Sequence, residues 1–507
     1  MKKYILLFMA ILMTVFLSAC GVERPDTVSY VLEAEPSRLD PAMTTALAES
    51  NTELQIFEGL TRLVDDVPQP ALAKSWDISD DGRTYIFHLR DGIEWSDGTP
   101  ITAGDIEYSW KRVVNPDVAS ENAYMLFCID KAEDYFKKKA SADEVGVKAL
   151  DDKTLEVRLK EPTSYFLNLT AFHCYYPVPR KLVEEKPDTW AADAEGMVSS
   201  GPFKIVSWNH SSEIKLVKNE RYWDADAVKL SHIDLPISDS QATRLTLVES
   251  NQANMTVEPP PADQERLEKM GLYKIAPYLG AYYYVFNVQQ KPFDDVRVRK
   301  AFALSVQRQG LIDHIIRAEK EPAYAWVPPG LKDKATGRDF REEGGNLITE
   351  DPEKARELLR EAGYDETHPL PPVTILFNTN EMHKAVAEAI QEMWKNNLGV
   401  SVSLMNQESK VFMASRAQGD YQVARASWIA DYADPMTFLD VFADEENDAQ
   451  YHNPAYNELI RRAKSTNDEA QRMAYMHQAE QMLFDDCVII PIYYTTQPYV
   501  AQPYIKG

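Results

Sequence analysis

Short apolar segments alternate with segments of helical spacing throughout the second half of this chain. Strand-like runs lie at 282–287, 373–378, 400–406 and 421–428, and helical runs lie among them at 294–316, 351–363 and 383–397. Strands joined through helices of this length form βαβ units in a parallel sheet. The first half is more mixed, with strands expected at 27–33, 85–90, 154–160 and 213–219 and helices at 49–63 and 240–250. We therefore predict an α/β fold of two lobes with a cleft between them.

The length, charge and motif content of the chain limit its function. Its 507 residues suggest two to four domains, and its formal net charge of −25 disfavours binding to nucleic acid. The sequence contains no GxSxG, HExxH, GxxxxGK[ST] or GxGxxG motif, and no CxxC pair or Cys/His cluster. These absences argue against catalysis and against a metal site, and we expect no cofactor.

The first 20 residues have the pattern of an export signal. Lys2 and Lys3 precede an apolar run from Tyr4 to Leu17 that is too short for a comfortable membrane span. The Leu-Ser-Ala-Cys-Gly that follows resembles the bacterial lipoprotein motif, in which the cysteine is lipidated and becomes the mature N-terminus. This resemblance predicts a lipid anchor at Cys20, and the alternative is an ordinary cleaved signal.

Three further cysteines, Cys128, Cys174 and Cys487, have two interpretations. Export permits a disulfide, and Cys128 with Cys174 is the favoured pair because Cys487 begins the strongly apolar run CVIIPIYY. The alternative is that all three are buried, reduced thiols.

Candidate binding residues are concentrated between Arg416 and Pro435. The strand YQVARASW leads into a turn that contains Trp428 and Asp431, and Arg416 and Arg425 precede this turn. Two arginines and an aspartate would suit a ligand with a cation at one end and an anion at the other, and a free peptide is such a ligand. The residues alone also permit simpler roles, since Asp431 can cap the turn and the arginines can form surface ion pairs.

Four passages in the same order resemble one protein family. They are ALAKSWDISDDGRTYIFHLRDGIEWSDGTPITAGDIEYSWKRVVNP at 71–116, SSGPFKIVSWNHSSEIKLVKNERYWD at 199–224, YYYVFNVQQKPFDDVRVRKAFALSVQRQGLI at 282–312 and RASWIADYADPMTFLDVF at 425–442. Together they look like the extracytoplasmic solute-binding proteins of oligopeptide ABC importers, family 5. The resemblance covers roughly 27–494. It implies a two-lobed periplasmic-binding-protein type II fold with a hinge, a ligand cleft and an extra side domain.

The family organisation implies a division of the chain into a signal and three domains. Residues 1–20 would be the lipoprotein signal. The first lobe would be discontinuous and comprise 21–57, 182–279 and 491–507. The side domain would comprise 58–181 and the second lobe 280–490.

The resemblance also implies roles for four residues around the turn. Asp431 would bind the α-ammonium group of a peptide, and Trp428 would line a side-chain pocket. Arg416 and Arg425 would meet the carboxylate of shorter peptides, since a guanidinium can bind a carboxylate through two hydrogen bonds.

Further contacts follow from the family pattern elsewhere in the chain. His383, in the segment NTNEMH that begins with Asn378, would meet the carboxylate of longer peptides, although a histidine on a helix surface is the simpler interpretation. Main-chain groups of Ser427 and Ile429, and of the stretch that ends at Leu47 in the opposite lobe, would pair with the peptide backbone.

Some positions depart from the family pattern. An acidic contact residue corresponds to Thr45, a pocket tyrosine to Asn122 and a pocket tryptophan to Ser409. The family's disulfide positions correspond to Gly280 and Ile429, so that bridge is absent. These changes leave the preferred peptide length and side chains open.

The resemblance implies a monomeric, lipid-anchored binding protein outside the cytoplasmic membrane. It would deliver peptides to the permease and ATPase subunits of an ABC importer. Two alternatives remain: a non-peptide solute such as a metal chelate, haem, an opine or a sugar, or a surface receptor without a role in transport. Asp431 and Asp434 could form a catalytic carboxylate pair, but nothing in the sequence supplies the two different environments that such a pair needs.

Overall fold

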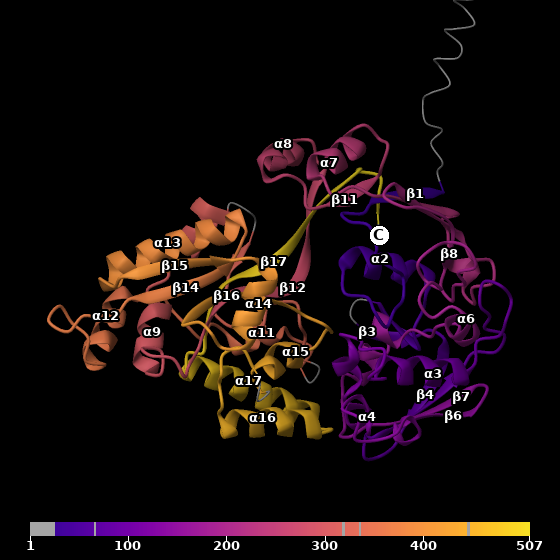
Figure 1. Ribbon diagram of the computed structural model, residues 1–507, viewed down its shortest axis with the longest axis horizontal. Helices are drawn as coiled ribbons and strands as arrows, with labels where there is room; N and C mark the ends of the chain where they lie inside the picture. Colours follow the sequence, from indigo (N-terminus) through magenta and orange to yellow (C-terminus); the bar gives the residue numbers. More distant parts are fainter. Residues whose placement is uncertain (1–25, 65–66, 317–319, 334–335, 444–446, 507) are drawn as a thin grey trace, which may run out of the picture.

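The computed structural model describes residues 26–64, 67–316, 320–333, 336–443 and 447–506. Within these ranges the chain forms two lobes and a side domain (Figure 1). The expected signal and its Cys20 lie outside the described residues. None of the described helices is both long and apolar enough to cross a membrane.

One large sheet runs through both lobes. Among the described residues it has eleven strands in the order β15-β14-β16-β12-β17-β11-β1-β10-β9-β8, with β13 beside β17. Its strands are β1 (Thr27–Val31), β8 (Phe203–Asn209), β9 (Glu213–Lys218), β10 (His232–Pro236), β11 (Met255–Val257), β12 (Tyr273–Phe286), β13 (Glu321–Pro322), β14 (Val373–Asn378), β15 (Val402–Gln407), β16 (Val423–Ile429) and β17 (Ile489–Ala501).

The long strands β12 and β17 connect the two lobes. Their antiparallel pairing covers Tyr273–Pro277, is interrupted, and resumes at Ala281 opposite Tyr494. We call the part of the sheet that contains β13 to β16 lobe II, and β17 belongs to this part up to Tyr494. We call the part that contains β1 and β8 to β11 lobe I, and the rest of β17 belongs to it through its pairing with β11. The expected domain boundary at 490 therefore lies within the part of β17 that pairs in lobe II.

Lobe II has the parallel pairing that the sequence predicts. β14 pairs in parallel with both β15 and β16, so the chain returns through a helix after each strand. The Asp351 side chain caps the helix Pro352–Glu361 by accepting a hydrogen bond from the main-chain N–H of Lys354. The Asn380 side chain caps the helix Glu381–Leu398 in the same way. The helices of this lobe are α9 (Val296–Leu304), α10 (Arg308–Leu311), α11 (Phe340–Gly344), α12 (Pro352–Glu361), α13 (Glu381–Leu398), α14 (Ser409–Ala417), α15 (Met436–Leu439), α16 (Pro454–Ser465) and α17 (Glu469–Asp485).

The side domain lies beside lobe I and is built on its own antiparallel sheet. That sheet has the order β4-β5-β7-β6 and buries Trp110 and Phe166 with ring centroids 6.3 Å apart. Its elements are β4 (Ala73–Ile78), β5 (Thr84–Leu89), β6 (Val147–Asp151), β7 (Thr154–Arg158), α3 (Ala103–Val113), α4 (Ala132–Phe136) and α5 (Phe166–Leu169). Lobe I adds α2 (Leu47–Ile56), α6 (Arg180–Glu185), α7 (Gln241–Glu249) and α8 (Gln264–Lys269).

Short helices and a hairpin complete the described structure. They are the hairpin β2 (Thr61–Val64) and β3 (Val67–Pro70), the 3-10 helices η2 (Ala123–Leu126), η3 (Ala142–Glu144), η4 (His173–Tyr175), η5 (Ala225–Ala227), η6 (Pro261–Asp263) and η8 (Asp440–Phe442), and the π-helix η7 (Ile312–Ile316). One continuous core of buried apolar side chains extends through both lobes and the side domain, and a smaller core lies among β1, β17 and α7.

The structure corrects one expected helix. The helical run at 49–63 ends at Ile56, because Phe57 is extended and Thr61 starts the hairpin. Gly59 passes so close to another segment that a Cβ there would lie 2.3 Å from the carbonyl oxygen of Thr170. The chain beyond Ile56 thus packs against a segment far along the sequence, which helical spacing alone does not reveal.

Candidate functional site

The strand β16 leaves part of one edge unpaired. It pairs with β12 along all seven of its residues. On the other side it pairs with β14 at Val423 and Ala424. From Arg425 to Ile429 that second edge has no strand partner among the described residues. An extended chain can add to such an edge as a further strand, and Ser427 and Ile429 lie within it.

The carboxylate of Asp431 lies in the turn directly after β16 and has no described cation beside it. Its Oδ2 accepts a hydrogen bond of 3.1 Å from the hydroxyl of Tyr124 in the side domain. Its main-chain N–H donates to Thr437 Oγ1 at 3.2 Å. Burial raises the pKa of the Asp431 carboxyl, and the bond from Tyr124 lowers it by a smaller amount. The ammonium group of a ligand would supply the positively charged partner that this carboxylate does not have among the described residues.

The simpler role considered for Asp431, capping the turn, belongs to Asp434. Asp434 Oδ1 accepts from the main-chain N–H of Met436 at 2.9 Å. Its two oxygens also accept from Arg472 at 2.6 and 2.9 Å, and both side chains are almost completely buried. A carboxylate held in this way has a structural role, so Asp431 and Asp434 do not form the carboxylate pair of a glycosidase.

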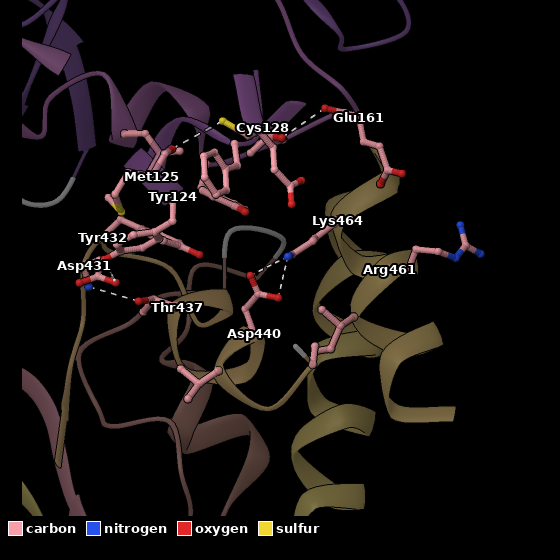
Figure 2. Close-up of a pocket in the computed structure, with 18 of the residues that line it drawn as sticks. Tyr124, Met125, Cys128, Glu161, Asp431, Tyr432, Thr437, Asp440, Arg461 and Lys464 are labelled. Carbon is pink, nitrogen blue, oxygen red and sulfur yellow. Dashed lines mark hydrogen bonds and ion pairs between the residues drawn. The ribbon is translucent and has the colours of Figure 1, made fainter. Parts of the chain in front are cut away.

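A cavity of about 750 Å³ reaches from Asp431 between the side domain and lobe II. Figure 2 shows Tyr124 and Glu161 of the side domain facing Asp431 and Asp440 of lobe II across it. Trp428 also lines this cavity. Its indole N–H is buried without a hydrogen-bond partner among the described residues.

A second group of site residues gathers around the guanidinium of Arg425. Its two terminal nitrogens donate to Asn378 Oδ1 at 3.4 Å and to Ser427 Oγ at 3.2 Å. The guanidinium also lies 4.9 Å from the ring centre of Tyr282. No carboxylate of the described residues forms an ion pair with it, and its Nε is buried without a partner. Arg425 is thus a half-buried cation whose neighbours are neutral.

His383 belongs to the same group. Its Nδ1 lies 3.2 Å from the hydroxyl of Tyr282. Burial, and in addition the charge of Arg425, lowers the pKa of His383 to about 4. The imidazole is therefore neutral at pH 7, although a ligand carboxylate placed here would favour its protonated form.

Arg416 differs from Arg425 because it already has an acidic partner. Its Nε lies 2.7 Å from Asp448 Oδ2, and its guanidinium lies over the ring of Phe412. The structure thus favours the ion-pair interpretation of Arg416 over a free ligand contact.

The opposite lobe presents the stretch before α2 in a capped conformation. The main-chain N–H groups of Thr45 and Ala46 both donate to Glu49 Oε2, at 3.1 and 3.2 Å. These two donors are therefore engaged within the chain in this structure. Leu47 follows them at the start of α2 and is half exposed.

Two positions that depart from the family pattern lie away from the cavity. Asn122 donates through Nδ2 to the carbonyl oxygen of Thr44 at 2.7 Å and so ties the side domain to lobe I. Ser409 is exposed at the start of α14.

The sequence left two interpretations of the cysteines open. In the structure Cys128, Cys174 and Cys487 are all free thiols, which agrees with the interpretation of reduced thiols. Cys128 Sγ instead lies 3.8 Å from the hydroxyl of Tyr175. Burial raises the pKa of the Cys128 thiol to about 11 and that of Cys487 to about 12, so both stay protonated and unreactive.

Three further residues lie at the site and were not predicted from the sequence. Tyr124 contacts Asp431, Tyr493 stacks on Tyr282 with centroids 4.8 Å apart, and the Lys320 ammonium lies 5.4 Å from the ring centre of Tyr493. Burial lowers the pKa of Lys320. A tyrosine in a loop or a lysine after a helix carries no local pattern, so only the contacts identify them.

Outside the cleft, Asp333, Glu343 and His477 bring three potential ligand atoms within 4.8 Å of one another. Glu343 is ion-paired with Arg338, and the charge of Arg341 also acts on His477. Because an arginine already pairs with Glu343, we assign the group to the ion-pair network of lobe II.

Comparison with known proteins places this geometry in a family. The model for the bacterial extracellular solute-binding proteins, family 5, matches residues 67–450. The oligopeptide-binding protein OppA of Bacillus subtilis (strain 168) is 36% identical over 100% of this chain and 96% of its own length. YgiS of Escherichia coli (strain K12), a probable deoxycholate-binding periplasmic protein, is 35% identical over 94% of this chain and 90% of its own.

The solved structures agree with these relatives. The murein tripeptide binding protein MppA, in its unliganded open form, superposes with a TM-score of 0.80 at 31% identity, over 96% of this chain and 94% of that one. Matches of this extent cover both lobes and the side domain. The chain belongs to the bacterial extracellular solute-binding proteins of family 5, and it is the non-enzymatic solute-binding subunit of an ABC importer.

Proposed function

We propose that this protein captures short peptides by their main chain and both termini and delivers them to the permease of an oligopeptide importer. One observation carries the proposal: the unpaired edge of β16 lies between a carboxylate without a cation, Asp431, and a cation without a carboxylate, Arg425. A zwitterion with an extended backbone matches all three features.

The spacing of these groups suggests the length of the ligand. A strand rises about 3.3 Å per residue, so Arg425 and Ile429 lie roughly 13 Å apart along β16. A peptide of about three to five residues would span this edge and place its ammonium group near Asp431. Lys320, beyond the stacked tyrosines Tyr282 and Tyr493, would offer a second position for a carboxylate.

A bile acid such as deoxycholate is the second candidate ligand, because a relative of similar identity carries that name. Deoxycholate has a carboxylate and no ammonium group. It would pair with Arg425 and leave the Asp431 carboxylate without a cation. The charge of Asp431 therefore favours a peptide.

The proposed membrane attachment rests on the N-terminal pattern. A lipid on Cys20 would hold the protein at the outer side of a membrane near its importer. Mass spectrometry of the native protein should find a mature N-terminus at Cys20 with an added diacylglycerol. An unmodified N-terminus at another residue would contradict the anchor.

Calorimetric titration tests the ligand. The soluble mature domain is titrated with trialanine, N-acetyl-trialanine, trialanine amide and deoxycholate. We expect acetylation to weaken binding at least about 30-fold, because it removes the charge that pairs with Asp431. In Asp431→Asn the free and acetylated peptides should bind equally, and in Arg425→Gln the acid and the amide should bind equally.

Each outcome of this titration has a definite meaning. Equal binding of free and acetylated trialanine to the wild type would remove Asp431 as the ammonium site. Binding of deoxycholate alone would replace the peptide with a bile acid. Circular dichroism of Asp431→Asn controls for folding. We expect its melting temperature not to fall, since the variant removes a half-buried charge that has no oppositely charged partner among the described residues, and the amide oxygen can still accept from Tyr124.

A further inference from the structure

The side domain and lobe II touch through stacked aromatic rings. The ring of Tyr165 lies on that of Tyr432 with centroids 4.6 Å apart and 4° between the planes. The guanidinium of Arg472 lies 5.5 Å from the centre of the Tyr165 ring. Tyr165 is only 7% exposed. In Figure 1 the side domain and α17 lie at the opposite end of the molecule from β11 and α7. This contact is therefore separate from the strands that join the lobes.

The stacked tyrosine belongs to the same short turn as the candidate ammonium site. Tyr432 follows Asp431 directly, and Asp434 in this turn is held by two hydrogen bonds from Arg472. The turn is thus fixed from within lobe II by Arg472 and from the side domain by Tyr165. Because Tyr432 and Asp431 are consecutive residues, a shift of the Tyr432 backbone also shifts Asp431, and the stack links the side domain to this carboxylate.

We propose that the side domain is a functional part of the ligand site, in which the Tyr165–Tyr432 stack positions the turn of Asp431 and stabilises the lobe arrangement that binds ligand. Tyr165 and Tyr432 are positioning residues in this proposal and need not touch the ligand. The proposal uses the proposed function only for the role of Asp431, since the effect on lobe arrangement does not depend on which solute binds.

The physical consequence is a shift in the population of the binding arrangement. When only a fraction of molecules has that arrangement, the apparent affinity for every ligand falls by the same fraction. The contribution of an aromatic pair corresponds to a factor of about twofold to tenfold in such an equilibrium. Loss of the stack should thus weaken all ligands equally and should open the empty protein.

The test compares Tyr165→Leu with Tyr165→Phe, which keeps the ring and removes the hydroxyl. Small-angle scattering of the ligand-free protein should show a larger radius of gyration for Tyr165→Leu and an unchanged one for Tyr165→Phe. Calorimetry with trialanine and N-acetyl-trialanine should show both peptides weakened about twofold to tenfold in Tyr165→Leu, with their ratio unchanged. This result differs from that expected for Asp431→Asn, in which trialanine and N-acetyl-trialanine should bind with equal affinity.

A second variant guards against misfolding of the side domain. Tyr432→Leu removes the other ring from lobe II and should give the same opening, and adding Tyr165→Leu to it should have little further effect, because the stack is already lost. An unchanged radius of gyration in both leucine variants would overturn the proposal. Equal damage from Tyr165→Phe and Tyr165→Leu would overturn the role of the stacked ring. Scattering of the ligand-free variants tests the effect of the stack on the lobe arrangement even if trialanine does not bind to the protein.

Discussion

At the scale of single residues, charge balance distinguishes residues of the same type. Asp434 and Arg416 are neutralised by Arg472 and Asp448, whereas Asp431 and Arg425 have no oppositely charged partner among the described residues. An unpaired charge removed from water costs free energy, and a ligand of opposite charge recovers part of it. The two unpaired charges therefore lower the stability of the empty protein relative to neutral residues at the same positions. A zwitterionic ligand offsets this free-energy cost.

We predict that His383 titrates near pH 4 in the empty protein, because burial and then Arg425 lower its pKa to about 4. In the unfolded chain the ordinary value is about 6.5. Between these values the unfolded chain binds a proton that the folded protein does not, so this residue lowers stability as the pH falls from 6.5 towards 4. NMR titration of the imidazole Cε1–H measures the value directly.

Two comparisons make this titration decisive. Arg425→Gln should raise the pKa of His383 without restoring it fully, because the larger effect of burial remains. Trialanine should also raise it if the peptide carboxylate lies beside Arg425. A value near 6.5 in the empty wild-type protein would show that His383 is solvated and not part of this group.

At the scale of secondary-structure elements, the close approach of β12 and β16 shapes the site. Gly280 lies opposite Ile429, next to the gap in the pairing of β12 with β17. A Cβ at Gly280 would lie 2.5 Å from Ile429 Cδ1, 2.6 Å from Thr495 Oγ1 and 2.7 Å from the carbonyl oxygen of Trp428. Glycine lets the strands meet where β16 carries the candidate ligand edge.

We therefore predict that Gly280→Ala destabilises the protein by about 1–3 kcal/mol, the usual cost of overpacking. It should also weaken ligand binding, because Trp428 and Ile429 must shift. Gly104→Ala is the matched control, since its Cβ would meet only Thr102 Oγ1 at 3.4 Å within the helix α3. Thermal unfolding of both variants checks this, and a melting temperature of Gly280→Ala equal to that of the control would contradict it.

At the scale of the whole molecule, the strands β12 and β17 run between the lobes, and the Tyr165–Tyr432 stack lies between the side domain and lobe II. The pairing of β12 with β17 is interrupted between Pro277 and Ala281, where the strands pass from one lobe to the other. Bending at this place therefore disturbs few hydrogen bonds. The cavity beside Asp431 is lined from both the side domain and lobe II. A ligand that contacts both would favour the closed arrangement, which is the hinge type of motion.

We predict that the bound ligand makes the molecule more compact. A single compact chain of this length has a radius of gyration of about 23 Å. The empty two-lobed protein should exceed this value, and saturating trialanine should reduce its radius by on the order of 1 Å. Small-angle scattering measures the change, with Asp431→Asn at the same peptide concentration as the weakly binding control. Equal radii with and without a peptide that calorimetry shows to be bound would exclude closure.

Much of this architecture follows from the sequence by local rules. Apolar alternation and spacing located β14, α7, α12 and α13 to within a few residues, because hydrophobic faces and capping residues such as Asp351 and Asn380 act over one or two turns. Family-specific passages pointed to the turn at Asp431. The prediction of a helix at 49–63 was wrong beyond Ile56, where the chain packs at Gly59 against a segment more than 100 residues away.

The tertiary structure alone decided which charges are left unbalanced. Asp431 and Asp434 lie in the same turn, and Arg416 and Arg425 lie in neighbouring elements. Their local sequences do not show which member of each pair has an oppositely charged partner. Their partners are Tyr124, Arg472 and Asp448, which come from other elements or another domain. A sequence determines which groups a chain carries and the local structure around them, whereas electrostatic pairing depends on distances that only the folded chain sets.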